Sequence, residues 1–382
     1  MSVHESNLIN IIKTFINNIK LIKYDYPEQD TIIHVQRKEY IDKIMHTFTN
    51  YAQRYKEYPD SHIILRWFYT QKLLDTTNID PLLPYNEEIN EGLHYELLKY
   101  RALSEDVTEI STIIYNMIKK FKPITSSESS GLTNVELVQD GEDYTLFRGT
   151  LKFRLFKSTY QKLSILYNGE SDKFITRMFN LFCRYYSLSS PGYHAAIPPS
   201  LFNTLKSHLQ VNHEIFASPF NCNLDIGSYT SAYPDTDKYF GSKGNFFGVH
   251  KDLFKNGGSF EANPPFLEEY MIALTFIIIR ELKENNNPLS FVIVYPTWSD
   301  SISYKLLIES QFNVLKQKVL VFNENEHHYT QSSQYWIKIG SDKISTSKSS
   351  IFILQNDAGE VKYRITDETI NKIKENFKIK DL

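Results

Sequence analysis

Hydrophobic side chains recur at helical spacing in the first third of the chain and in short strand-like runs in the second half. Between residues 7 and 115 they follow one another at intervals of three and four, and prolines between residues 27 and 84 interrupt them. This pattern predicts several helices. Residues 144–148 and 151–155 instead alternate apolar with polar side chains around Gly149, which predicts a β-hairpin followed by two helices.

The second half has the pattern of an α/β fold. The stretch 271–282 lies between two strand-like runs and has the length and amphipathicity of a crossover helix. The strand-like runs are residues 214–218, 258–262, 289–295, 317–322 and 350–355. Residues 125–141 are rich in Ser, Thr and Gly, which predicts a connecting loop. We therefore expect a mainly helical domain over residues 1–140, and a second domain over 141–382 that includes the hairpin.

Charge and cysteine content narrow the function classes. The net charge of -3 excludes a uniformly basic nucleic-acid-binding surface, so nucleic acid would need a local patch. Cys183 and Cys222 are too few for a disulfide scaffold or a cysteine zinc site. The longest apolar run is too short to cross a membrane and the N-terminal sequence lacks a secretory signal. We expect an intracellular, soluble protein without membrane association.

The most informative stretch is the strand-like run 258–262 and the tetrapeptide Asn263-Pro264-Pro265-Phe266 that follows it. The prolines end the strand, and two acidic residues then begin a helix. In an open α/β sheet, ligands bind at the carboxyl ends of strands. Taken alone, the tetrapeptide is equally well explained as a Pro-Pro turn whose asparagine caps the helix.

The tetrapeptide also has the groups needed to methylate an exocyclic adenine amine. The lone pair of that amine is delocalised into the ring, so the nitrogen needs to be held in line with the methyl group. Two acceptors, the Asn263 side-chain carbonyl and the Pro264 backbone carbonyl, would bind the two amine protons and favour a pyramidal nitrogen. Phe266 would stack on the base. An amide accepts a hydrogen bond without carrying a charge, and neither a metal nor a general base is required.

Four blocks of the sequence carry a resemblance to a known family. They are residues 216–221 (Phe-Ala-Ser-Pro-Phe-Asn), 232–242 (Ala-Tyr-Pro-Asp-Thr-Asp-Lys-Tyr-Phe-Gly-Ser), 258–266 and 288–291 (Pro-Leu-Ser-Phe). In order and spacing they resemble the phosphorylated-CTD-interacting-factor family of cap-specific adenosine N6-methyltransferases, from about residue 146 to residue 356. The resemblance implies a Rossmann-like S-adenosylmethionine-dependent methyltransferase core with a helical domain. It also implies methylation of N6 on the cap-adjacent 2′-O-methyladenosine of capped mRNA.

The resemblance implies roles for individual residues. By matching position, the catalytic tetrad is Asn263, Pro264, Pro265 and Phe266. The cofactor S-adenosyl-L-methionine is expected to contact Ser218, Pro219 and Asn221 at its methionine end, and Asp235, Asp237, Phe240 and Gly241 at its ribose or adenine. An Asp-rich solvated turn explains either aspartate equally well.

Three further features are candidates for substrate binding. Trp298 follows a predicted strand and could form a wall of the adenine or cap pocket, or simply lie at the edge of the core. Glu326 belongs to a Glu-His-His-Tyr stretch that lacks the ligand set of a metal site and matches a substrate-side loop of the family. Arg148 and Arg154 lie in the densest basic run and suit cap phosphates, although such runs are usually solvated.

The chain departs from animal members of the family in one respect. They carry a WW domain that binds the phosphorylated polymerase tail and needs two tryptophans about twenty residues apart, whereas this chain has only Trp67, Trp298 and Trp336. We therefore expect no WW-mediated binding to that tail, and we favour the cytoplasm slightly over the nucleus.

Two other functions stay open on the sequence. The same chemistry could act on an internal RNA adenine or on DNA. Alternatively, the chain could be a catalytically silent cap- or RNA-binding subunit. We expect a cap pocket between the helical part and the core, because clefts between domains usually bind ligands.

Overall fold

The computed structural model of the chain forms two compact units, one of residues 21–190 and the other of residues 1–20 and 191–382. The described residues are 26–53, 62–75, 79–85, 89–98, 104–123, 134–188, 194–315, 319–332, 343–344 and 347–379, with the single residues 10, 13, 14 and 17. Each unit has its own core and is described by itself.

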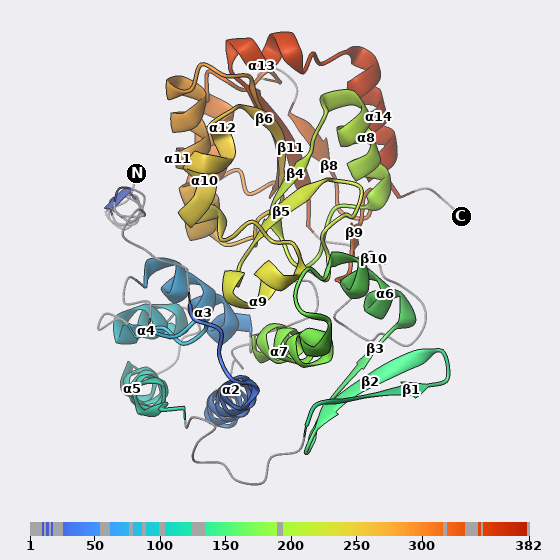
Figure 1. The fold of residues 1–382 in the computed structure, drawn as a ribbon. Helices are drawn as coiled ribbons and strands as arrows, with labels where there is room; N and C mark the ends of the chain where they lie inside the picture. The colour runs from blue at the N-terminus through green and yellow to red at the C-terminus, as the bar shows by residue number, and fades with distance from the viewer. Residues whose placement is uncertain are drawn as a thin grey trace. The chain divides into compact units, whose positions relative to one another are not determined.

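The unit of residues 21–190 combines helices with a small antiparallel sheet (Figure 1). Its described helices are α2 (Thr31–Ala52), α3 (His62–Leu74), α4 (Ile89–Leu98), α5 (Ser104–Lys120), α6 (Lys157–Leu166) and α7 (Phe174–Ser187), with a 3-10 turn η3 (Ser171–Lys173). Helix α2 packs against α5 and α7, and α4 packs against α3 and α5. The strands β1 (Glu136–Asp140), β2 (Asp143–Arg148) and β3 (Leu151–Leu155) pair in that order. The hairpin around Gly149 and the predicted helices that fall within the described residues are confirmed, whereas most of the helical pattern between residues 7 and 25 lies outside them.

Two features of this unit differ from the prediction. Residues 136–140 form the edge strand β1 rather than a loop; its side chains are mostly exposed, so no hydrophobic alternation marks it. The units divide near residue 190, whereas the sequence suggested a boundary near 140. The reason is that α7 packs on α2, and its buried Arg177 pairs with Glu28 at 3.0 Å.

The second unit is built on a central mixed sheet, which confirms the α/β prediction. In spatial order its strands are β5 (Ser228–Ser231), β4 (His213–Ala217), β6 (Gly258–Ala262), β7 (Leu289–Pro296), β11 (Ser349–Gln355) and β8 (Leu320–Phe322). The first four are mutually parallel, and β11 runs antiparallel to both of its neighbours. A separate two-stranded pair joins β9 (Tyr329–Thr330) to β10 (Lys343–Ile344).

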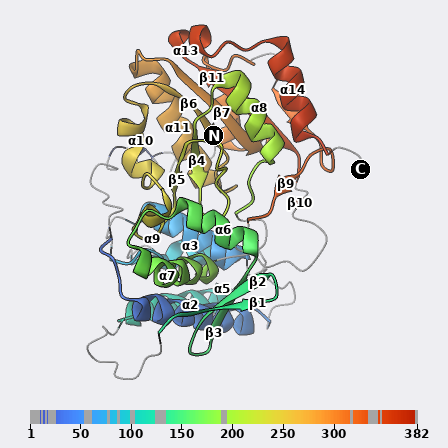
Figure 2. The same ribbon diagram turned by 45° about the vertical axis from the view of Figure 1, so that its right-hand side comes forward.

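Helices cover both faces of this sheet (Figures 1 and 2). One face carries α10 (Phe246–Phe254), α11 (Glu268–Glu284) and α12 (Ile302–Glu309), and the other carries α8 (Pro199–Leu209) and α14 (Asp367–Phe377). The short helices α9 (Pro234–Asp237) and η4 (Lys238–Phe240) follow β5, and α13 (Asp357–Lys362) follows β11. The predicted crossover helix over residues 271–282 is thus confirmed as part of α11.

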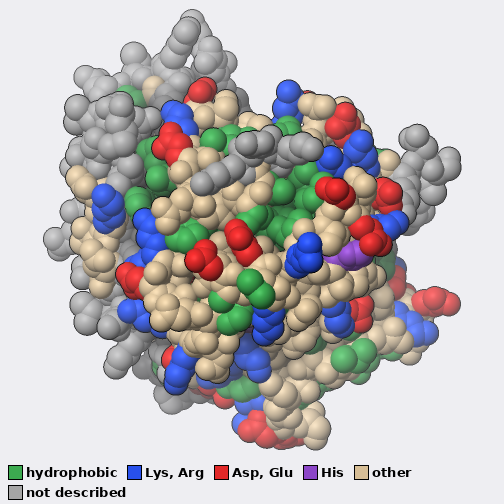
Figure 3. All heavy atoms as spheres, turned by 90° about the horizontal axis from the view of Figure 1, so that it is seen from above, with side chains coloured by type: hydrophobic (Ala, Val, Ile, Leu, Met, Phe, Trp, Pro, Cys, Tyr) green, Lys and Arg blue, Asp and Glu red, His purple; other side chains and the backbone are tan. Residues whose placement is uncertain are grey.

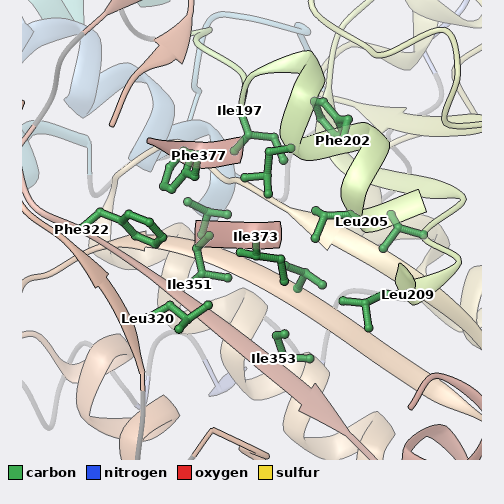
Figure 4. Close-up of a cluster of buried hydrophobic side chains, with 14 of the residues drawn as sticks. Ile197, Phe202, Leu205, Leu209, Leu320, Phe322, Ile351, Ile353, Ile373 and Phe377 are labelled. Carbon is green, nitrogen blue, oxygen red and sulfur yellow. The ribbon is translucent and has the colours of Figure 1, made fainter. Parts of the chain in front are cut away.

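A hydrophobic core joins α8 and α14 to the sheet (Figure 4). Leu205 of α8 and Ile373 of α14 pack with Ile353 of β11, and all three side chains are fully buried. Burial of such side chains is the main stabilising contribution to a fold of this kind. Phe266 of the predicted tetrad is partly buried and packs against this same core.

Charged side chains of both signs lie on the surface. On the face seen in Figure 3, Lys and Arg side chains are interspersed with Asp and Glu side chains. No helix in the part of the chain that the structure describes is both long enough and apolar enough to cross a membrane.

Candidate functional site

The tetrad lies at the point where the strand order of the sheet reverses. Strand β4 has β5, the next strand in the chain, on one side and β6 on the other. Because β4 and β6 are parallel, with Glu214 opposite Glu261, the loops after them leave the same edge of the sheet. These loops are residues 218–221 and 263–266, the two blocks predicted to bind cofactor and substrate. Such a reversal creates the crevice in which open α/β sheets bind ligands.

Asn263 has one half of its amide fixed and the other half available. Its Nδ2 donates a hydrogen bond of 3.1 Å to the backbone carbonyl of Ala195. Its Oδ1 is buried and accepts no hydrogen bond from any residue that the structure describes. A buried acceptor without a donor is costly unless a ligand or water supplies one. The amide orientation therefore leaves an acceptor of the type predicted for an amino-group substrate.

Residues 194–196 connect the two loops. The carbonyl of His194 accepts a hydrogen bond of 3.0 Å from the Asn221 side chain, and the next carbonyl, that of Ala195, holds Asn263. Ala196 then exchanges two backbone hydrogen bonds with Thr330 of β9, of 2.9 and 2.8 Å. Sequence reasoning missed this segment, because it acts through backbone carbonyls that leave no side-chain signal.

Phe266 lies between two other aromatic rings. Its ring meets that of Trp298 edge to face, with centroids 6.5 Å apart, and that of Tyr329 in the same way at 6.0 Å. Trp298 is 41% exposed, whereas Tyr329 is buried. The structure therefore brings together the two aromatic residues predicted to face the substrate, with Trp298 on the solvent side.

Ser218 and Asn221 of the loop after β4 bind each other. Asn221 Oδ1 accepts hydrogen bonds from the Ser218 backbone N–H at 2.6 Å and from the Ser218 hydroxyl at 2.8 Å. The Ser218 hydroxyl in turn accepts from the backbone N–H of Phe220 at 3.2 Å. These bonds give Ser218 and Asn221 a role in shaping the loop, while their direct contact with a cofactor, and that of Pro219, stays a prediction.

The residues after β5 are well buried. Asp235 and Asp237 lie in α9, and Asp237 is fully buried and accepts a hydrogen bond of 2.9 Å from Thr236 Oγ1. Phe240 is also fully buried, and its carbonyl accepts from the Tyr229 hydroxyl at 2.6 Å. Gly241 has a φ of 93°, a conformation that favours glycine, so the turn itself explains this residue.

Two carboxyl groups that sequence reasoning did not single out lie beneath the loops. Glu214 and Glu261 are opposite each other on β4 and β6, and both are buried. Glu214 accepts a hydrogen bond of 2.5 Å from the backbone N–H of Asn223, whereas Glu261 Oε1 has no partner among the described residues. Burial, and after it the charge of Glu214, raise the pKa of Glu261 well above its usual value.

Three further predicted residues lie outside the two loops of the site. Glu326 is exposed and binds the backbone N–H and side chain of Asn323. Arg148 and Arg154 lie on β2 and β3 of the other unit, where Arg154 is 3.7 Å from Asp143. Their roles at the substrate stay predictions. Within the described ranges, no three His, Cys, Asp or Glu side chains form a group that could hold a metal ion.

Comparison with known proteins supports one family. Residues 154–332 match the family model described as "Phosphorylated CTD interacting factor 1 WW domain". The matched segment includes β4, β5, β6 and β7, and thus both loops of the site. Two curated relatives are 29% identical, one from Homo sapiens over 307 residues and one from Mus musculus over 312 residues. Each is named "mRNA (2'-O-methyladenosine-N(6)-)-methyltransferase".

The alignments cover 76% and 78% of this chain but only 42% of the length of each relative. The chain thus spans less than half of the curated relatives that it matches. These findings confirm the resemblance inferred from the four sequence blocks.

Proposed function

Because the chain is a relative of the phosphorylated CTD interacting factor family, we propose that it is an S-adenosylmethionine-dependent methyltransferase. Its substrate is N6 of the cap-adjacent 2′-O-methyladenosine of capped mRNA. The observation that carries this proposal is the buried Oδ1 of Asn263, which lacks a donor among the described residues and lies at the strand-order reversal. The names of the two mammalian relatives support the substrate and the position methylated.

The sheet and its loops fit a nucleoside-containing methyl donor. The order of the four parallel strands, with its reversal at β4, supports a Rossmann-like core. Residues 218–221 after β4 would hold the methionine end, and Asp235 or Asp237 after β5 carries a carboxylate suited to two ribose hydroxyls. When bound, S-adenosylmethionine supplies a methyl group on a positively charged sulfur.

The residues of the tetrad have different roles in binding the adenine. Asn263 Oδ1 accepts one amine proton in a hydrogen bond, and its orientation is set before the substrate arrives because Ala195 holds Nδ2. The Pro264 carbonyl accepts the other, and no backbone N–H of a described residue is found to donate a hydrogen bond to it. Phe266 and Trp298 supply aromatic surface for the base. Preorganised acceptors of this kind stabilise the transition state because they need no rearrangement during the reaction.

Methyl transfer to defined RNAs tests the proposal. Capped RNA beginning with A and capped RNA beginning with G are incubated with methyl-labelled cofactor, and uncapped RNA beginning with A is the third substrate. We expect label only in the capped RNA that begins with A, at N6 of its first nucleotide. Equal labelling of the A-start and G-start RNAs, or none in either, would reject the proposal. Equal labelling of capped and uncapped RNA would favour an internal RNA adenine instead.

The cap, rather than the RNA body, should dominate recognition. A chain of net charge -3 is not suited to a long phosphate track. Removing the N7 methyl group of the cap is therefore expected to lower kcat/KM more than scrambling the RNA beyond its first nucleotides. The positive charge of the methylated base favours stacking on aromatic side chains, and the chain has 26 Tyr and 25 Phe to provide them. A larger effect of the body sequence would contradict this preference.

A further inference from the structure

A buried chain of hydrogen bonds lies behind Phe266. The Tyr329 hydroxyl donates to Ser349 Oγ at 2.8 Å, and Ser349 Oγ is 2.8 Å from His327 Nε2. His327 Nδ1 is 3.0 Å from the carbonyl of Asn323, which can only accept, so Nδ1 carries the hydrogen. A neutral imidazole then leaves Nε2 to accept from Ser349. All three side chains are buried and each bond in the chain has a donor and an acceptor.

This chain of hydrogen bonds fixes the ring of Tyr329 against Phe266. The Tyr329 ring lies edge to face between Phe266 at 6.0 Å and Phe377 of α14 at 5.6 Å. Phe377 also contacts the ring of His327, with centroids 4.8 Å apart. The Tyr329 ring is therefore held at its hydroxyl and on its side, and it offers a fixed surface to Phe266.

Thr330, the residue after Tyr329, is linked to Asn263 at the start of the tetrad. Thr330 pairs with Ala196 through two backbone hydrogen bonds, and the adjacent carbonyl of Ala195 orients the Asn263 amide. Tyr329 of β9 thus contacts Phe266 directly. The next residue, Thr330, acts on Asn263 indirectly, through residues 195 and 196.

We propose that Tyr329 and Thr330 are the positioning residues of the tetrad, with His327 and Ser349 holding Tyr329 in place. Tyr329 sets the plane of Phe266, and Thr330 sets the position of the carbonyl that orients Asn263. Neither residue touches the reacting atoms. The kinetic consequence rests on the proposed methyltransferase function, whereas the order of the tetrad can be measured without it.

Hydrogen exchange at the tetrad tests the positioning role directly. The backbone N–H groups of Phe266 and Leu267 report local order, and that of Leu267 donates to the Pro265 carbonyl at 2.7 Å. In Tyr329→Leu we expect their exchange to rise about tenfold, because an aromatic pair and a hydrogen bond are lost. Tyr329→Phe keeps the ring and loses only the hydroxyl bond to Ser349, so exchange should rise about threefold rather than tenfold.

Tyr304 of α12, which faces the next residue of β11, provides a matched control. Tyr304 is also a buried tyrosine, and its hydroxyl is 3.2 Å from the hydroxyl of Ser350, the residue after Ser349. Its ring contacts Phe352 rather than the tetrad. Tyr304→Leu should therefore lower the free energy of unfolding without raising exchange at Phe266 and Leu267. Equal exchange increases in Tyr329→Leu and Tyr304→Leu would overturn the proposal.

A milder pair of variants covers the case in which Tyr329→Leu does not fold. Ser349→Ala leaves every ring in place and removes the common partner of Tyr329 and His327, so exchange at the tetrad should rise about threefold. Ser350→Ala should leave it unchanged. The same response in both serine variants would overturn the proposal.

Kinetic measurements then test the positioning role separately from the proposed methyltransferase function. Tyr329→Leu should lower kcat about tenfold while the Kd for S-adenosylhomocysteine changes less than twofold, because only the tetrad is displaced. If kcat is unchanged although the tetrad exchanges faster, the positioning role is overturned. If the unmodified protein transfers no methyl group to capped RNA, the proposed function fails, and the exchange data still decide the positioning role.

Discussion

The side-chain nitrogen of Asn263 lies 3.1 Å from the backbone carbonyl of Ala195 and donates a hydrogen bond to it. A carbonyl can only accept, so this bond determines which end of the amide is used by the protein and which end stays available. The available end is the buried Oδ1. The assignment of that oxygen to an acceptor role thus follows from a contact made by the opposite atom.

Asn263→Ala is expected to abolish most activity with little effect on folding. Losing one preorganised acceptor typically lowers kcat about 10²–10³-fold. The Kd for S-adenosylhomocysteine should change little, since the change removes an acceptor for the substrate amine. Methyl transfer under saturating cofactor measures the effect, and Asn203→Ala, an exposed asparagine on α8, is the control. More than about a third of normal turnover in Asn263→Ala would contradict its assigned role.

Trp298→Ala is expected to weaken RNA binding selectively. The side chain is 41% exposed and meets Phe266 edge to face, so its removal takes away stacking surface and little core. The KM for capped RNA should rise about fivefold or more. The free energy of unfolding should change by less than about 0.5 kcal/mol, as for most surface substitutions. An unchanged KM would place Trp298 outside the substrate pocket.

Glu261→Gln is expected to stabilise the protein increasingly as pH rises. Burial raises the pKa of Glu261, so the folded state keeps a proton that the unfolded state releases above about pH 4.3. The stability contributed by the protonated group is complete below that pH and declines as pH rises towards the folded pKa. The free energy of unfolding declines by at most about 1.4 kcal/mol per pH unit from this cause. Glutamine does not ionise, so the variant lacks this decline.

Urea unfolding between pH 5 and pH 8 measures the difference between Glu261→Gln and the unchanged protein. Glu360→Gln, at an exposed glutamate on α13, is the control for the same substitution at the surface. A difference that stays constant with pH for Glu261→Gln would show that Glu261 ionises normally in the folded protein.

His213 is expected to make the fold sensitive to acid. Desolvation by burial, and after it the charge of Lys243, lower the pKa of His213 to about 4, against about 6.5 when unfolded. The unfolded state therefore binds more protons between these values. The stability contributed by neutral His213 is complete above pH 6.5 and is lost as pH falls towards 4.

His213→Gln should show a smaller loss of unfolding free energy between pH 6.5 and pH 4.5 than the unchanged protein. Glutamine retains groups able to bind the Ser228 and Thr230 hydroxyls, which lie 2.7 and 3.3 Å from the imidazole nitrogens. His46→Gln, at an exposed histidine, is the control for the same substitution at the surface. Identical slopes in all three proteins would exclude His213 as a source of acid sensitivity.

Hydrophobic runs in the sequence predicted the strands with apolar side chains, and they could not predict a buried strand with polar side chains. The run at residues 289–295 matches β7, because a central strand covered on both faces is mostly apolar on both. Strand β5 has the sequence Ser-Tyr-Thr-Ser and was missed. Its polar groups are satisfied by specific partners, such as the hydrogen bond from Thr230 Oγ1 to the Ile215 carbonyl, and such partners are not visible in a sequence.

The candidate site could be proposed from its motif residues, whereas the segment that holds the motif could not. Asn263 and Phe266 stand out as residue types, and Trp298 follows a strand end. Ala195 contributes only a carbonyl, and its distance of 68 residues from Asn263 in the chain hides the contact. Tyr329 was visible as part of a loop, but its role behind Phe266 depends on Ser349 and Phe377, which lie later in the chain.

The packing of Phe377 on Tyr329 also has a consequence for biosynthesis. The ribosome adds the tetrad more than a hundred residues before it adds Phe377, and β11 with Ser349 lies between them. Until residue 349 has been added, β9 lacks its hydroxyl partner in β11, and until residue 377 has been added it lacks its ring partner in α14. A nascent chain would then carry the complete motif without the supports that align it. If the chain is the methyltransferase proposed above, methyl transfer would reach its full rate only after translation has passed residue 377.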